Sequence, residues 1–289
     1  MLRGMYSAIS GLKMHQAMLD VTANDIANVN TIGYKGSRTT FTDQLSQLQG
    51  AGTAPVVGAG GGRNPAQIGL GVQFGSIDNL MGGGALQATS NVLDLAVQGE
   101  GWFRVTADGP DDMTSRAGAP AEAQAFTRAG NFTRNSAGFL VTQGGEYLLG
   151  KSAIDGGEDV YLMVPDGASN MTVSATGEVT YLNNTTGLKE SAGYLTLAKF
   201  PNEAGLERAS TNLWRVSAAS GPEAPLGGGG YIPGTNGAGK VVSGVVEMSN
   251  VDLASEFTEL ISAQRGFQAN SRVISTSDEM LQELVNLKR

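Results

Sequence analysis

The chain has 289 residues and carries 19 Lys and Arg residues against 27 Asp and Glu residues, a formal net charge of −8. This acidic balance excludes nucleic acid as an expected partner, because such binding relies on clustered basic side chains. The absence of cysteine excludes disulfides, thiolate metal sites and cysteine nucleophiles. The apolar runs are too short to cross a bilayer, so we expect no membrane insertion. The first residues lack the pattern of a cleaved secretory signal, so we expect none.

The N-terminal segment has the periodicity of a helix. Seam positions recur every seven residues in two rows, at alternating spacings of three and four, which is typical of a coiled-coil seam. One row is apolar throughout, and the other includes Gln16 and Ala23. The stretch "ANDIANVNTIGYKG" follows, and its three asparagines and first glycine are poor helix formers that should end the helix. We assign residues 1–34 to this element, and we expect its seam to consist of Leu2, Met5, Ile9, Leu12, Leu19 and Ile26.

Residues 35–90 have the composition of a linker. Gly, Ala and Pro are dense in "GAGTAPVVGAGGGRNPAQIGLGVQFG". Such sequence is compliant and rich in turns. We therefore predict an extended Gly/Ala-rich connector over 35–90.

From residue 91 the apolar period changes to two. "LDLAVQG" and "GWFRVTADG" are typical of strands that end at glycine turns. "MTVSATGEVTYL" predicts a hairpin that turns at Thr176 and Gly177. We expect residues 91–248 to form an antiparallel β domain of about eight to eleven short strands, with Trp102 and Trp214 in its core.

Two features resemble sites of chemistry. Residues 145–152, "GEYLLGKS", fit the phosphate-loop pattern G-x-x-x-x-G-K-[S/T]. A phosphate loop opens a helix whose N–H groups hold the phosphates, whereas Tyr147 and Leu149 alternate like strand residues. The single histidine, His15, lies off the predicted seam and is expected to face solvent. We therefore predict no enzyme activity, no catalytic residue, no cofactor and no metal site.

A second helix is predicted at the C-terminus, over residues 249–289. Asn250 or Asp252 can cap its start. One row of its seam is apolar, but the companion row contains Gln264, Ser271 and Asp278, as the first helix contains Gln16. We therefore expect a seam that is open to water or to other chains, where polar residues can set the register. Its predicted contact residues are Leu253, Phe257, Leu260, Phe267, Ile274 and Leu281.

These elements predict an α+β chain. Its N- and C-terminal helices would pair as a coiled coil, joined through the connector to the antiparallel β domain. The alternative is an ordinary helical pair packed on a globular body.

Several stretches resemble the bacterial flagellar rod and hook family. "LDVTANDIANVNTIGYKGSRTTF" is similar to its N-terminal signature, in which a helix ends in an Asn-rich segment followed by Gly, an aromatic residue and Lys. The resemblance continues through "QIGLGVQFGSIDNLMGGGALQATSNVLDLAVQGEGWFRV", "FTRAGNFTRNSAGFLVTQGGEYLLG" and the C-terminal stretch from "GVVEMSNVDLASEF" onward. Residues 155–240 are not distinctive. The signature residues are Asn24, Asn28, Asn30, Gly33, Tyr34 and Lys35.

The resemblance implies a structural subunit of the bacterial flagellum. Terminal helices of many copies would pack as an inner tube, with the β domains outside. The implied partners are other copies in a helical homopolymer, other axial proteins at the rod and filament ends, the flagellar export apparatus and the hook cap. Type III export without a cleaved signal would deliver the chain to the hook or basal body, outside the cytoplasm.

Within this family the sequence favours one member. The C-terminal stretch and "NPAQIGLGVQFGSID" are more similar to a compact hook protein, which couples the basal-body rod to the filament. The length of the chain keeps a distal-rod protein as the alternative. A surface adhesin or binding module is a further alternative, which would need no polymerisation.

Overall fold

The computed structural model describes residues 2–54, 61–110, 123–152, 159–165, 167–184, 186–224 and 229–287. The chain divides into two compact units. Unit 1 comprises Met1–Ala27, Ser37–Asp78 and Asp252–Arg289, and unit 2 comprises Asn28–Gly36 and Asn79–Val251. The chain therefore passes between the units at four points.

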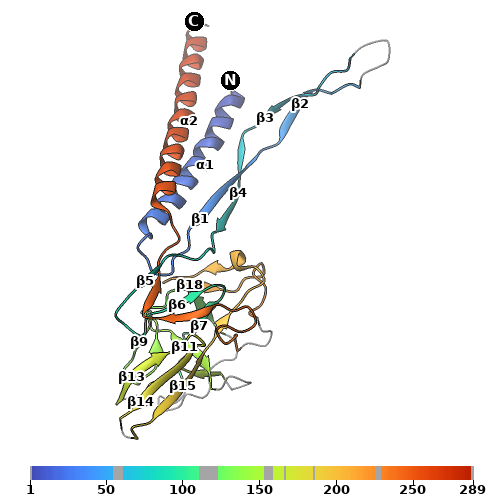
Figure 1. Ribbon diagram of the computed structural model, residues 1–289. Helices are drawn as coiled ribbons and strands as arrows, with labels where there is room; N and C mark the ends of the chain where they lie inside the picture. The colour runs from blue at the N-terminus through green and yellow to red at the C-terminus, as the bar shows by residue number, and fades with distance from the viewer. Residues whose placement is uncertain are drawn as a thin grey trace. The chain divides into compact units, whose positions relative to one another are not determined.

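Unit 1 contains both helices, α1 (Leu2–Ala27) and α2 (Leu253–Leu287), which lie side by side (Figure 1). Asp252 caps α2, because its Oδ1 accepts a hydrogen bond from the Ala254 N–H at 3.0 Å. No helix in the described ranges is long and apolar enough to cross a membrane. A helix near each end of the chain and a large antiparallel sheet confirm the predicted α+β class.

Unit 1 also contains a β ribbon. β1 (Ser37–Asp43) pairs with β4 (Val72–Asn79), and β2 (Ser46–Gly50) pairs antiparallel with β3 (Ala66–Gly69) (Figure 1). The segment expected to be an extended connector thus contains paired strands, although residues 55–60 lie outside the described ranges. Thr, Val, Ile and Phe are frequent in β1 and β4 and favour strands, a signal that the nearby glycines obscured.

Unit 2 is built on an antiparallel sheet of twelve strands among the described residues. Its main path runs β13-β14-β15-β11-β7-β8-β18-β17. Two further pairs, β5 with β20 and β6 with β19, join the start of this unit to its end. The strands are β5 (Leu86–Ala88), β6 (Leu95–Gln98), β7 (Trp102–Thr106), β8 (Ala125–Thr127), β9 (Thr133–Arg134), β10 (Leu140–Val141), β11 (Tyr147–Lys151), β12 (Asp159–Tyr161), β13 (Ala168–Val173), β14 (Glu178–Asn183), β15 (Lys189–Leu195), β16 (Leu197–Ala198), β17 (Glu207–Arg208), β18 (Leu213–Arg215), β19 (Lys240–Ser243) and β20 (Val245–Glu247).

The core of unit 2 confirms two interpretations of the sequence. Trp102 and Trp214 are both buried and meet edge to face, with ring centroids 5.6 Å apart. The phosphate-loop match lies in strand β11, which ends at Lys151 and pairs with β12 and β15. Lys151 is therefore the last residue of a strand, in agreement with the strand-like alternation of Tyr147 and Leu149.

Candidate assembly surfaces

Small side chains bring α1 and α2 together. A Cβ added to Gly11 would lie 2.5 Å from Asn270 Nδ2, and one added to Gly266 would lie 2.4 Å from the His15 ring. Ala263 is fully buried. The pairs run in opposite directions along the chain, so the helices are antiparallel. Because the side chains at a helix contact set the distance between the axes, these small residues allow a close approach.

This contact lies one position away from the predicted seam. The buried positions are Ala8, Gly11, Thr22, Asp25, Ala263 and Ser277. Of the predicted residues, the half-buried ones are Met5, Ile9, Leu12, Leu19, Ile26, Leu260, Ile274 and Leu281, and the exposed ones are Leu253, Phe257 and Phe267. The side chain of Leu2 lies outside the described residues.

The helical period was predicted correctly, but the phase of the contact was not. Gly, Ala, Ser and Thr give little hydropathy signal, so the large apolar rows were taken for the contact between the two helices. The expectation for His15 was wrong for the same reason. It was expected to face solvent, but it packs against Gly266, and its Nδ1 is buried with no hydrogen-bond partner among the described residues.

Large apolar side chains remain uncovered on α2. Phe257 is 50% exposed, Ile261 48% and Leu284 50%. The other exposed apolar residues of this helix are Leu253, Phe267, Val273, Met280, Val285 and Leu287. Extended apolar surfaces of this kind mark sites of protein association. Small residues thus lie at the contact between the two helices, and α2 also presents large apolar side chains to solvent.

An acidic group lies near the start of α2. Burial, together with the neighbouring carboxylates of Asp25, Glu259 and Asp252, raises the pKa of Glu256 to about 7. Each of these groups belongs to unit 1. The charged form of Glu256 is therefore disfavoured in the folded helix pair.

This shift predicts a pH dependence of helix pairing. Because the folded pKa exceeds the ordinary value of 4.5, stability is greatest at low pH and falls as the pH rises from about 4.5 through 7. Glu256→Gln should remove this slope and stabilise the pair at pH 8 by about 1 kcal/mol, after allowance for solvent screening. Helix melting by circular dichroism at pH 5 and pH 8 measures it. Glu283→Gln, at an exposed position of α2, is the control. An unchanged slope in Glu256→Gln would contradict the prediction.

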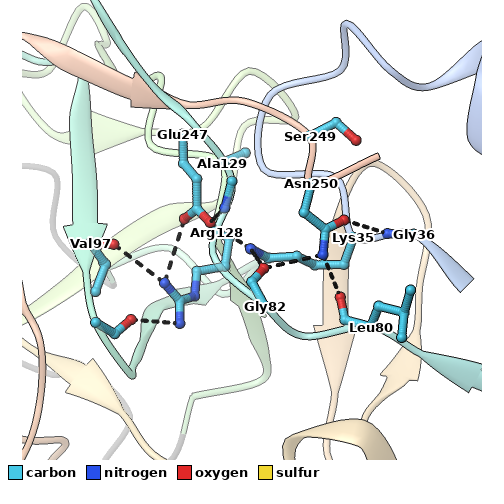
Figure 2. A network of polar contacts seen from close by, with 12 residues as sticks. Lys35, Gly36, Leu80, Gly82, Val97, Arg128, Ala129, Glu247, Ser249 and Asn250 are labelled. Atoms are coloured by element: carbon cyan, nitrogen blue, oxygen red, sulfur yellow. Dashed lines mark hydrogen bonds and ion pairs between the residues drawn. The ribbon is translucent and has the colours of Figure 1, made fainter. Parts of the chain in front are cut away.

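Unit 2 contains a buried polar network around Lys35 (Figure 2). Lys35 Nζ lies 2.5 Å from Glu247 Oε1 and donates to the Gly82 carbonyl oxygen at 2.9 Å. Arg128 Nη1 lies 3.5 Å from Glu247 Oε2, and Glu247 Oε1 also accepts from the Gly84 N–H. Burial lowers the pKa of Lys35, and the Glu247 carboxylate opposes this change. The pairing offsets the cost of burying these charges.

Backbone contacts hold the same segment. The Gly33 N–H donates to the Glu247 carbonyl oxygen at 2.8 Å, and the Gly36 N–H donates to Asn250 Oδ1 at 2.8 Å. Gly33 has φ +69°, and a Cβ there would lie 2.5 Å from the Ala129 nitrogen. Only glycine fits this position.

The signature residues thus divide into two groups. Gly33, Tyr34 and Lys35 are buried in unit 2, whereas Asn24 and Asn30 are exposed. Asn28 is half-buried, and its Oδ1 accepts a hydrogen bond from the Thr31 hydroxyl at 3.1 Å. Sequence reasoning missed Glu247 and Arg128, and it considered Asn250 only as a possible cap of the C-terminal helix, a role that Asp252 has. The one available signal was an acidic residue at the end of the apolar strand β20.

The network joins the start, middle and end of unit 2 and has no reactive geometry. No three His, Asp or Glu side chains in the described ranges could hold a metal ion together. The contacts of the network hold the segment that follows α1 in place on unit 2.

Three family models match this chain, and each includes one of the three charged residues of this network. The model described as flagella basal body rod protein matches residues 5–35, which include Lys35. The flagellar hook protein FlgE/F/G D1 domain matches residues 96–181, which include Arg128. The flagellar basal body rod FlgEFG protein C-terminal model matches residues 242–287, which include Glu247.

Full-length relatives decide the family. The flagellar basal-body rod protein FlgG of Bacillus subtilis is 44% identical over 291 residues, which cover 100% of both chains. The chain belongs to the flagellar rod and hook protein family. The FlgG rod protein of Agrobacterium fabrum is 37% identical over 96% of this chain and 97% of its own. This member of the family is therefore a structural protein of the flagellar axis.

The comparisons correct one expectation. The sequence favoured a hook protein, but the flagellar hook protein FlgE of Borreliella burgdorferi is only 27% identical, over an alignment of 448 residues. The FlgG rod protein of the same organism is 31% identical over 289 residues. The rod alternative therefore fits this flagellar protein better. The hook interpretation depended on motifs that hook and rod members share.

Proposed function

We propose that this chain is a subunit of the flagellar basal-body rod, of the distal-rod type. The observation that carries the proposal is the full-length match to rod proteins, at 44% identity with equal coverage of both chains. The chain length agrees with this reading, since the hook relative aligns only over a much longer span.

The proposed mode of assembly is a helical homopolymer formed through the terminal helices. The exposed apolar side chains of α2 support it, because copies that pack side by side could bury them. The twelve residues predicted for the assembly interface remain candidates for these contacts. The helices α1 and α2 would form the inner layer, and residues 91–248 the outer one. Other axial proteins would cap both ends of the polymer, and export would use the flagellar apparatus.

Electron microscopy of basal bodies from cells that lack this gene tests the proposal. We expect the distal rod and everything beyond it to be missing, with recovery when the gene is returned. Complete rods that lack only hooks would support the hook alternative instead. Intact flagella with lost surface binding would support an adhesin.

A further inference from the structure

Arg208 lies between two aromatic rings of unit 2. Its guanidinium carbon is 4.6 Å from the centroid of the Tyr34 ring and 5.1 Å from that of Trp214. Its Nη1 donates to the Tyr34 hydroxyl at 2.9 Å, and its Nη2 donates to the Lys35 carbonyl oxygen at 2.5 Å. One side chain therefore contacts two consecutive residues of the N-terminal signature.

The matched family models do not include this residue. The matched models stop at residue 181 and resume at residue 242, and the sequence between 155 and 240 is not distinctive. The same region nevertheless supplies a second contact, since Asn212 Nδ2 donates to the Ile32 carbonyl oxygen at 3.1 Å. The hairpin of β17 and β18 thus contacts the segment 28–36 through Arg208 and Asn212, and these contacts are additional to the Lys35 network.

We infer that Arg208 is a positioning residue that holds residues 28–36 on unit 2. Tyr34 is 5% exposed and Trp214 2%, so the guanidinium of Arg208, a residue that is itself exposed, stacks on two buried rings. A guanidinium can stack on a ring and donate hydrogen bonds in its own plane, whereas an ammonium group cannot do both. A positive charge at position 208 is therefore not sufficient to hold the segment; the guanidinium group is required.

The consequence for assembly rests on the rod function proposed above. Residues 28–36 continue directly from α1, the helix to which that proposal gives an assembly role. Loss of Arg208 should release this segment while the sheet of unit 2 remains folded. The polymer would then form poorly, although the helix pair and the sheet of unit 2 remain folded.

Limited trypsin digestion of the full-length monomer tests the inference. Lys35 is completely buried, so cleavage after it requires the segment to leave unit 2, and its rate follows the population of the released form. In Arg208→Ala we expect this cleavage to accelerate at least about tenfold, which corresponds to ~1.4 kcal/mol. In Arg208→Lys we expect a similar acceleration of this cleavage. Arg215→Ala, at an exposed position of the adjoining strand β18, should cleave at the wild-type rate.

Cleavage after the buried Arg104 reports on the sheet itself. Faster cleavage after Lys35 with unchanged protection of Arg104 supports the inference. A wild-type rate at Lys35 in Arg208→Ala overturns it, and so does equal acceleration at both sites, which indicates a general loss of stability. If Arg208→Ala does not fold, Arg208→Lys decides by the same criteria. Because the digestion uses monomers, its outcome is independent of whether cells lacking the gene lose the rod.

Discussion

Lys35→Met is expected to lower the free energy of unfolding of unit 2 by about 3–5 kcal/mol. The substitution leaves the Glu247 carboxylate buried, with Arg128 as its remaining cation at 3.5 Å. A buried charge without a close partner is far more costly than the ion pair is stabilising. Urea unfolding followed by tryptophan fluorescence measures this effect, because both tryptophans, Trp102 and Trp214, lie in unit 2.

Two further variants separate the charge from general damage. The double variant Lys35→Met/Glu247→Gln should recover part of the loss, because it removes the unpaired charge as well. Lys240→Met changes an exposed lysine of β19 and should stay within about 0.5 kcal/mol of the wild type. If the double variant is no more stable than Lys35→Met, the ion pair is not the reason for the loss.

Ile261→Asp is expected to prevent polymerisation without destabilising the monomer. Ile261 is 48% exposed on α2, so a carboxylate there costs the free subunit little. In a polymer that buries this face, each copy would carry an unpaired buried charge, at a cost of several kcal/mol. The concentration needed for assembly should therefore rise by roughly a hundredfold or more. Sedimentation of purified polymer measures it, and circular dichroism verifies that the helices are retained.

Gln268→Asp supplies a matched control for this prediction. It adds the same charge to an exposed polar position of the same helix and should permit assembly at close to the wild-type concentration. Assembly of Ile261→Asp at the wild-type concentration would exclude this face of α2 from the subunit contacts.

Local signals were sufficient to predict the kind and order of the main elements. The heptad spacing predicted α1 and α2, and the Asn and Gly residues after Ala27 end α1 as expected. The hairpin predicted at Thr176 and Gly177 forms between β13 and β14, with Gly177 at φ +78°. These features depend on interactions within a few residues of one another, and such interactions are visible in a single sequence.

The contacts that give these elements their roles were decided by the tertiary structure. Lys35 and Glu247 meet across 212 residues of sequence, and Arg104, in the fully buried strand β7, pairs with Glu223 at 2.5 Å. Neither pairing has a local signal, because any of several carboxylates could have balanced each cation. The phase of the helix contact was hidden for a related reason. Side-chain size at the point of closest approach determines it, and small residues such as Gly11 and Ala263 become informative only once the two helices are placed together.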